Sequence, residues 1–241
     1  MFSAEYYTSR HGQAFQNQLT DDYSSDPSAP VYRRWLETIA ARAGTGKILD
    51  VGCALGTFLA IARERGFTTR GVELSEFASS FARDRRKLDV FTGDLERFIA
   101  PDESFDVVTF WDAIEHVTHP LENLKTARRL TRTGGLLLVT TDNFDCLIAD
   151  VARLMYAASG GALRYGMERV FIDANRSYFT EITLRAMLEA AGYRVVICEK
   201  MEYPIDKIRT SPFERVVLQT FYAVAKLLHR EAQVTVIAEA C

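Results

Sequence analysis

The segment Lys47–Phe58 constrains the fold more than any other part of the chain. It begins with a short apolar run typical of a buried strand and ends with apolar residues at helical spacing. Gly52 and Gly56 lie between them. A strand, a glycine turn and a helix leave backbone N–H groups uncovered at the helix start, where they favour anions and ligands. We expect a ligand to contact this loop, because a side chain at either glycine would hold it away from the backbone.

A second apolar strand ends in Gly71-Val-Glu-Leu-Ser75, which places Glu73 23 residues after Asp50. An acid at about this distance, at the end of the second strand, can accept hydrogen bonds from both hydroxyls of a bound ribose. A glycine-rich strand–turn–helix alone is shared by nucleotide, flavin and adenosylmethionine binders. The acid therefore narrows the expected ligand to one that contains a ribose.

Strands and helices alternate between Lys47 and Val139, as in a parallel sheet with helices on both faces. The predicted strands are 47–52, 69–74, 88–92, 105–110 and 135–141, and the predicted helices are 31–42, 56–65, 76–87, 95–99 and 120–131. Thr180 caps a later helix that ends at Gly192. Two more strands are expected at 193–198 and 233–238. Between them, the apolar stripe of 212–229 predicts a helix packed on the core.

Three motifs carry a family resemblance. The sequences DVGCALG (50–56), GVELS (71–75) and FDVVTFWDAIEHV (105–117) resemble class I S-adenosylmethionine-dependent methyltransferases, in that family's order and spacing. The resemblance runs from about residue 45 to 200. Within the family, the sequence is similar to the ubiquinone-biosynthesis-like O-methyltransferases. It implies an α/β, Rossmann-like sheet of seven mostly parallel strands, with helices on both faces and the last strand antiparallel. It also implies S-adenosyl-L-methionine as cofactor and a small-molecule acceptor, expected to be methylated on a hydroxyl oxygen.

The resemblance also implies which residues bind the cofactor. In the family, the acid at the place of Asp94 binds the adenine amino group, and the residue at the place of Leu95 touches the ring. Asp94 also fits a helix N-cap, and the two roles are compatible. Trp111 either covers the adenine or sulfonium side or is a core residue. The implied cofactor contacts are Asp50, Gly52, Cys53, Ala54, Gly56, Glu73, Leu74, Asp94, Leu95 and Trp111.

His116 is the candidate catalytic base, because it follows the fourth predicted strand and has an ordinary pKa near neutrality. A histidine that only hydrogen-bonds the backbone and shapes the loop is the competing interpretation. His119 lies three residues later, so a metal site was considered. Pro120 disfavours a regular helical face there, and no third ligand group is evident, so we expect no metal.

Ala54 stands where the family motif most often has its middle glycine. Some relatives tolerate a methyl group at this position. The alanine nevertheless leaves a second hypothesis open, a non-catalytic adenosylmethionine-fold protein with a binding or regulatory role. A nicotinamide-dependent oxidoreductase is the remaining alternative. It is disfavoured because the phosphate-binding pattern Gly-x-Gly-x-x-Gly is absent.

Two segments flank or interrupt the alternating pattern. Residues 1–44 predict a helical segment with a tyrosine-rich start, either a lid over the cofactor or a strap on the core held by Tyr6, Tyr7 and Tyr23. Residues 142–177 form an insertion that we expect to cap the acceptor side of the crevice. The alternative for 145–158 is a helix lying on a membrane surface, but its polar face lacks a basic bias.

The length of 241 residues fits one domain, 1–241, better than two. A net charge of −3 argues against a nucleic-acid surface and favours a metabolite, sugar, lipid or polyketide acceptor. The sequence shows neither an apolar run long enough for a membrane span nor a secretory signal. Four scattered cysteines favour reduced thiols in a cytoplasmic protein. We expect the protein to be a monomer or a homodimer.

Overall fold

The structure is a computed structural model and describes residues 19, 23, 26–171, 174–205 and 211–241. Its described strands form one seven-stranded sheet in the order β3-β2-β1-β4-β5-β7-β6. The strands are β1 (Lys47–Val51), β2 (Thr68–Glu73), β3 (Val90–Thr92), β4 (Phe105–Trp111), β5 (Thr131–Asp142), β6 (Tyr193–Met201) and β7 (Gln233–Ala240). Each predicted strand is present, and β5 and β6 are longer than the apolar runs indicated.

The strand directions match the expected fold. β1 pairs in parallel with β2 and β4, β2 with β3, and β4 with β5. β7 lies antiparallel between β5 and β6, as predicted for the last strand. The chain order reverses where β1 meets β4, and ligands of open α/β sheets bind beside such a reversal, at the carboxyl ends of the strands.

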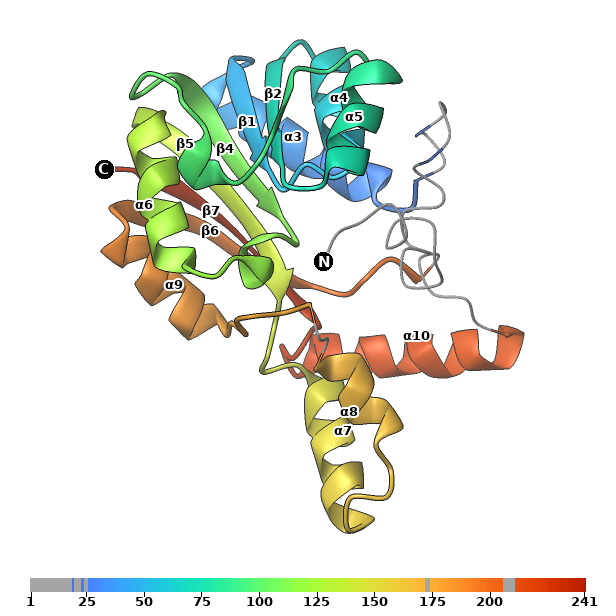
Figure 1. The fold of residues 1–241 in the computed structure, drawn as a ribbon. Coiled ribbons are helices and arrows are strands. Elements are labelled where there is room, and N and C mark those ends of the chain that lie inside the picture. The colour runs from blue at the N-terminus through green and yellow to red at the C-terminus, as the bar shows by residue number, and fades with distance from the viewer. Residues whose placement is uncertain (1–18, 20–22, 24–25, 172–173, 206–210) are drawn as a thin grey trace.

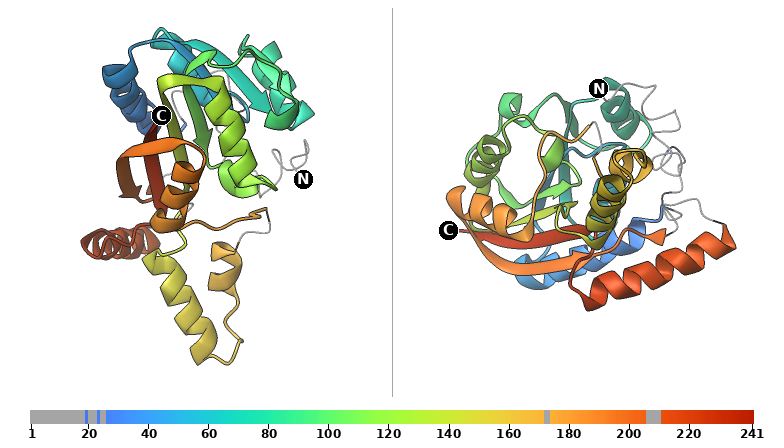
Figure 2. Two further views of the ribbon diagram at one scale, coloured as in Figure 1. Left: turned by 90° about the vertical axis from the view of Figure 1, so that its left-hand side faces the viewer. Right: turned by 90° about the horizontal axis from the view of Figure 1, so that it is seen from below.

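Helices cover both faces of the sheet (Figures 1 and 2). The described helices are α3 (Ala29–Ala43), α4 (Thr57–Glu64), α5 (Glu76–Asp84), α6 (Pro120–Leu130), α7 (Leu147–Ala158), α8 (Tyr165–Val170), α9 (Glu181–Ala190) and α10 (Pro212–Leu227), with the short 3-10 turns η2 (Leu95–Arg97) and η3 (Ile114–His116). α3, α4 and α5 pack on one face, and α6 and α9 on the other.

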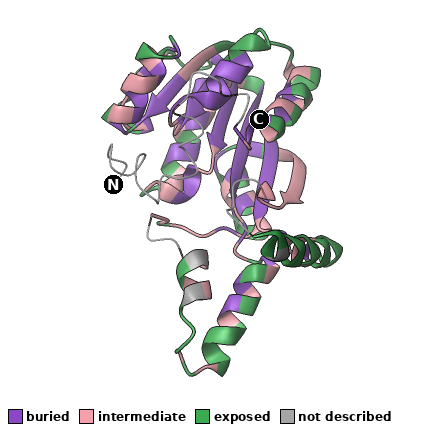
Figure 3. Cartoon of the chain, turned by 90° about the vertical axis from the view of Figure 1, so that its right-hand side faces the viewer, coloured by how far each residue is buried: buried purple, intermediate pink, exposed green. Residues whose placement is uncertain are grey.

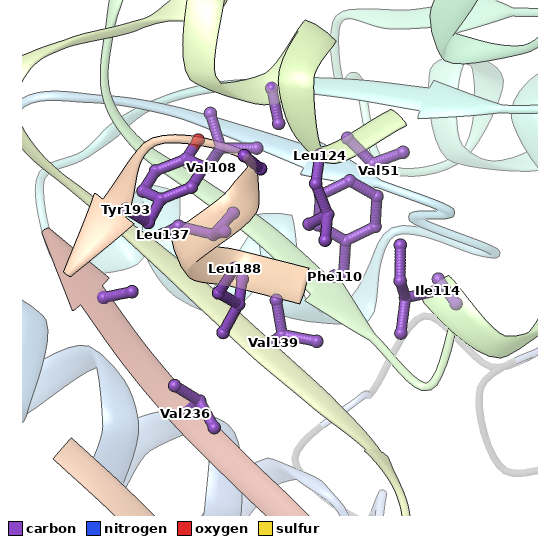
Figure 4. Close-up of a cluster of buried hydrophobic side chains, with 14 of the residues drawn as sticks. Val51, Val108, Phe110, Ile114, Leu124, Leu137, Val139, Leu188, Tyr193 and Val236 are labelled. Carbon is purple, nitrogen blue, oxygen red and sulfur yellow. The ribbon is translucent and has the colours of Figure 1, made fainter. Parts of the chain in front are cut away.

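The core has two layers, one on each face of the sheet. On the α6–α9 face, Leu124 and Leu188 are fully buried against Phe110 and Val139 of the central strands (Figure 4). On the opposite face, Trp35 of α3 is 1% exposed and packs in the same cluster as residues of α4. Each fully buried aliphatic side chain contributes about 1.5–3 kcal/mol, so this sheet is a rigid support for the loops at its edge.

Local signals account for several element boundaries. α5 begins at Ser75, whose hydroxyl accepts a hydrogen bond from the N–H of Ala78 at 3.3 Å. α9 begins with a capping box in which Thr180 and Thr183 exchange side-chain and backbone hydrogen bonds. Gly192 follows α9 with a φ of +91°, the left-handed conformation that glycine adopts without strain.

The prediction that the last helix packs on the core is wrong. α10 extends away from the sheet (Figure 1), and Val216 and Val217 are 61% and 53% exposed. Of its side chains in the described part of the chain, only Ala225 is buried, as Figure 3 illustrates. Apolar spacing predicts a helix with an apolar face, but it does not say which surface covers that face.

The insertion after β5 forms α7 and α8, which project from the end of the sheet where β4 and β5 end (Figure 1). Phe144, Phe171 and Tyr178 pack together at its base, with ring centroids 5.4–5.8 Å apart. That the insertion closes the acceptor side of the crevice stays a prediction. In the described ranges, no helix combines the length and apolar character that a bilayer crossing requires.

Candidate active site

The loop after β1 is fastened to the end of β2. The N–H groups of Gly52 and Cys53 donate to the carbonyl oxygen of Val72 at 2.8 and 3.2 Å. The N–H of Gly56 then donates to Cys53 O at 2.8 Å and closes the turn. α4 follows without a side-chain cap, so the first turn of the helix presents backbone N–H groups at the carboxyl edge of the sheet.

The two loop glycines are required for reasons other than the one we inferred from the sequence. Gly52 and Gly56 have φ angles of +76° and +82°, in the left-handed region that favours glycine. A Cβ at Gly52 would lie 2.7 Å from the Cβ of Ala113, and one at Gly56 would lie 2.5 Å from Leu88. A side chain at either position would point into the protein. These glycines therefore keep the loop compact rather than clearing space for a ligand.

Ala54 adopts the conformation that the usual middle glycine would have. Its φ is +48°, which costs an L-residue about 1–2 kcal/mol relative to ordinary helical backbone. Its N–H donates to Oε2 of Glu73 at 2.9 Å. The loop thus accommodates the methyl group of Ala54 with its N–H bonded to Glu73.

Glu73 links the glycine loop to the end of β2. Its side chain is 5% exposed, and its other oxygen, Oε1, accepts from the N–H of Ser75 at 2.8 Å. Burial raises the pKa of Glu73, while the N–H bonds from Ser75 and Ala54 lower it. The next residue, Leu74, is 62% exposed beside this carboxylate. An apolar side chain next to a fixed acid suits a flat base attached to a ribose.

Asp50 lies behind the loop and is 2% exposed. The hydroxyl of Thr109 on β4 donates to its Oδ1 at 2.7 Å. The pKa of Asp50 is raised to about 8. Burial is the largest cause, the hydrogen bond from Thr109 acts in the opposite direction, and the charge of Glu73 adds to the rise. A buried acid in this position favours a ligand that brings a positive charge.

Asp94 and Leu95 follow β3. Oδ1 of Asp94 accepts from the N–H of Arg97 at 2.9 Å, so the predicted N-cap is confirmed for the 3-10 turn η2. The side chain of Leu95 is 2% exposed and belongs to the core on the α6–α9 face. Only the backbone of Leu95 is therefore suited to meet a ligand at this edge.

Trp111 is part of an aromatic group formed with Tyr32 of α3 and Phe58 of α4. Its ring centroid lies 4.8 Å from that of Tyr32 and 5.1 Å from that of Phe58. Its buried Nε1 has no hydrogen-bond acceptor among the described residues. This geometry supports the packing interpretation of Trp111, and Tyr32 and Phe58 join it as residues that the motif did not indicate.

His116 lies at the end of η3, beyond β4. Its Nδ1 is 3.1 Å from the carbonyl oxygen of Ala174. A carbonyl only accepts hydrogen bonds, so Nδ1 carries the proton, and in the neutral ring Nε2 holds the lone pair. Burial lowers the pKa of His116, which keeps the ring neutral near pH 7. The backbone contact of the competing interpretation is present, and it produces the tautomer that a base requires.

Three acids around His116 were not predicted as a group. Asp112 accepts from Gln233 Nε2 at 2.7 Å, and Glu115 accepts from the Thr141 hydroxyl at 2.9 Å. Asp142 accepts from the Tyr203 hydroxyl. Burial, Asp112 and Asp142 raise the pKa of Glu115 well above its usual value. Asp112 and Asp142 each stand at or just after the end of a strand, a signal that the sequence does contain.

Those acids do not form a metal site. Within the described parts of the chain, no group of three or more histidine, cysteine, aspartate or glutamate side chains is arranged to hold a metal ion. The acids instead accept hydrogen bonds from β5, β7 and the segment after β6. They make the end of the sheet beyond His116 polar and acidic.

The described part of the N-terminal segment contacts the neighbourhood of the glycine loop. Leu19 packs in a cluster with Leu55 and Ala78. The hydroxyl of Tyr23 donates to Glu64 at 2.5 Å, and the Arg86 guanidinium lies 5.2 Å above its ring. Tyr6 and Tyr7, two of the tyrosines of the predicted lid or strap, lie outside the described residues.

The fold defines a Rossmann-like protein with the glycine loop and Glu73 at the carboxyl edge of the sheet, beside the β1–β4 reversal. A family model described as "Methyltransferase domain" matches residues 28–197. This chain belongs to that methyltransferase family. The predicted recognition is therefore confirmed, and the family supports S-adenosylmethionine as the cofactor.

Individual relatives agree with this assignment. The ubiquinone biosynthesis O-methyltransferase of Thiobacillus denitrificans is 36% identical over 121 residues, covering 47% of this chain and 51% of the relative. The chain thus spans about half the length of the curated relatives it matches. An S-adenosylmethionine-dependent methyltransferase from Mesorhizobium loti has the same fold, with a TM-score of 0.61, 18% identity, and 90% and 99% of the two chains covered. So does the [4+2]-cyclase SpnF, with a TM-score of 0.57, 17% identity, and coverage of 86% and 80%.

Proposed function

We propose that this chain transfers a methyl group from S-adenosylmethionine to a hydroxyl oxygen of a small molecule. The observation that carries the proposal is the hydrogen bond from the Ala54 N–H to Glu73, because it joins the glycine loop and the ribose acid into one surface. The O-methyltransferase names of the curated relatives support the oxygen acceptor. One of the structural neighbours is a cyclase, so the fold alone does not establish methyl transfer.

The residues fit the cofactor at several points. Glu73 retains lone pairs for the ribose hydroxyls, since each oxygen accepts one backbone N–H. Leu74 offers an exposed apolar side chain beside it. Asp94 and the backbone of Leu95 are the proposed adenine contacts. Asp50, buried with a raised pKa, suits the positive charge of the cofactor. Gly52, Cys53 and Gly56 hold the loop that faces it.

When bound, S-adenosylmethionine supplies an electrophilic methyl group on a positively charged sulfur. The part that falls to the chain is to align the acceptor, exclude water and receive a proton. We propose that Nε2 of His116 receives the proton of the acceptor hydroxyl, because the hydrogen bond to the Ala174 carbonyl keeps the ring's own proton on Nδ1. A general base of this kind contributes roughly 10²–10⁴-fold. Asp112, Glu115 and Asp142 line the polar surroundings of this step.

The acceptor is proposed to be a hydroxylated metabolite, sugar, lipid or polyketide rather than a nucleic acid. The net charge of −3 disfavours binding of a polyanion. The insertion α7–α8 is proposed to close the acceptor side. A single domain over 1–241 and a cytoplasmic location, inferred from the cysteine pattern, are part of this proposal.

The test uses cofactor labelled with an isotope on the methyl carbon, incubated with the protein and a small-molecule extract. We expect one class of product to carry the label as an O-methyl group, together with an equal amount of S-adenosylhomocysteine. Label recovered on nitrogen or carbon would overturn the oxygen assignment. Cofactor binding without any labelled product would favour the non-catalytic alternative.

A further inference from the structure

The insertion after β5 and the segment 212–228 leave apolar side chains uncovered. Eleven of the fourteen large apolar residues that the structure describes as exposed lie on them: Ile148, Val151, Leu154, Met155, Tyr156, Leu163, Val216, Val217, Val224, Leu227 and Leu228. We name this set the α7–α10 surface. The helices α7 and α10 that carry most of it extend beyond the sheet layers (Figures 1 and 2).

This surface holds most of the exposed large apolar side chains of the described residues. The exposed fractions run from 37% for Val151 to 80% for Leu227. Summed over α7, the segment after it and α10, they leave on the order of 1,000 Å² of side-chain area exposed. A standard stable protein interface buries about 800 Å² on each partner. The surface therefore has the area that a stable dimer needs.

α10 also lacks support from its own chain. Of its described side chains only Ala225 is buried, so the helix gains little from packing. Helices of about this length are marginal in water without such packing. Ser211 and Glu214 form a capping box that fixes the first turn, but a cap cannot replace the missing apolar contacts. A partner that covers the helix would supply them.

The charges favour a protein partner over a lipid surface. The two charged side chains of α7, Asp150 and Arg153, pair with each other at 2.8 Å, and Arg230 pairs with Asp150 at 2.5 Å. α10 carries one acid, Glu214, and two basic residues, Arg215 and Lys226. Helices that bind anionic membranes usually present about 4–8 lysines and arginines, and this surface has no such excess.

We propose that a second copy of this chain covers the α7–α10 surface. In a two-fold pair the same residues of both copies meet, so each copy provides the apolar area that the other requires. The surface is separate from the glycine loop and Glu73, so the pair can form whether or not the proposed reaction is correct. It would also hold α7 in place beside Asp142, where β5 ends.

The experiment measures the mass of the purified full-length chain by sedimentation equilibrium in the micromolar range. We expect about 54 kDa, twice the chain mass of 27.2 kDa. L154E and L227E each place a charge at the most exposed large apolar residue of its helix, and each should give a monomer. I182E is the matched control, because Ile182 of α9 is 77% exposed but lies outside the surface, and it should remain a dimer.

Circular dichroism and S-adenosylmethionine binding confirm that the variants are folded. A monomeric wild-type chain would overturn the proposal, whether it stays in solution or sediments with phosphatidylcholine–phosphatidylglycerol vesicles. The vesicle result would assign the surface to lipid instead. Dimers of folded L154E and L227E, indistinguishable from wild type, would also overturn it.

Discussion

The two halves of the sheet edge differ in how their residues are held. On the cofactor side, the glycine loop and Glu73 are joined by backbone hydrogen bonds between neighbouring parallel strands. On the proposed acceptor side, His116 contacts the carbonyl oxygen of Ala174, and the acids accept hydrogen bonds from side chains of distant segments, such as Gln233 and Tyr203. The first half is built from local backbone geometry and the second from long-range contacts, so substitutions should separate cofactor binding from turnover.

The largest expected effect is on turnover at the acceptor side. Replacing His116 with alanine should lower kcat by roughly 10²–10³-fold, because it removes the proposed base, and should leave the affinity for S-adenosylmethionine unchanged. The formation of S-adenosylhomocysteine measures turnover, and calorimetry measures binding. His119→Ala is the matched control, since His119 is an exposed histidine three residues away.

An H116N variant separates the base from a structural role. The amide nitrogen of asparagine lies where Nδ1 lies in histidine, so it can still donate to the Ala174 carbonyl. A histidine that only shapes the loop would be replaced with little loss of turnover. If H116N retains wild-type turnover, the base assignment is wrong. We expect it to be as slow as H116A.

The next effect in size is on cofactor binding. Glu73→Ala removes the acceptor for the N–H groups of Ala54 and Ser75 and for the ribose hydroxyls. Hydrogen bonds to a charged group contribute about 1.5–3 kcal/mol, so affinity for S-adenosylmethionine should fall roughly 100-fold. Calorimetry measures it, with Glu189→Ala on α9, an exposed glutamate, as the control. Equal affinities of the two variants would remove Glu73 from the site.

The comparison shows what the sequence can and cannot predict. The strand positions and the loop around Gly52 and Gly56 follow from local patterns, because strand ends and turns are set by nearby residues. The antiparallel β7 is implied by the family resemblance and not by any local pattern. The exposure of α10 could not be predicted, since its apolar stripe is the same whether a core or a partner covers it. Tyr203 and Gln233 reach the acids only through the completed sheet, and no spacing in the sequence links them to His116.

A smaller effect, on pH dependence, tests Asp50. With a pKa of about 8, Asp50 is mostly protonated in the free protein at pH 7. A bound cation favours the carboxylate, so cofactor binding should release a proton, and affinity should rise with pH by up to tenfold per unit until about pH 8. Calorimetry in buffers of different ionisation enthalpy measures the proton release. In Asp50→Asn the release and the slope should both disappear; their persistence would point to another group.

The smallest effect concerns the loop backbone. Ala54→Gly relieves the positive φ of +48° but adds freedom to the unfolded chain. The two terms nearly cancel, so the free energy of unfolding should change by less than about 1 kcal/mol. Cofactor affinity should change by no more than a few-fold. Ala162→Gly, in an exposed turn, is the control. A large gain in affinity would mean that the methyl group obstructs the site.

Calorimetric titration of the wild-type chain with S-adenosylmethionine tests the central claim most directly. If the glycine loop, Glu73 and Asp50 form one cofactor site, the titration should saturate at one molecule per chain, S-adenosylhomocysteine should compete for it, and nicotinamide dinucleotides should not. Absence of heat with the methyl donor, or its displacement by a nicotinamide dinucleotide, would contradict the account.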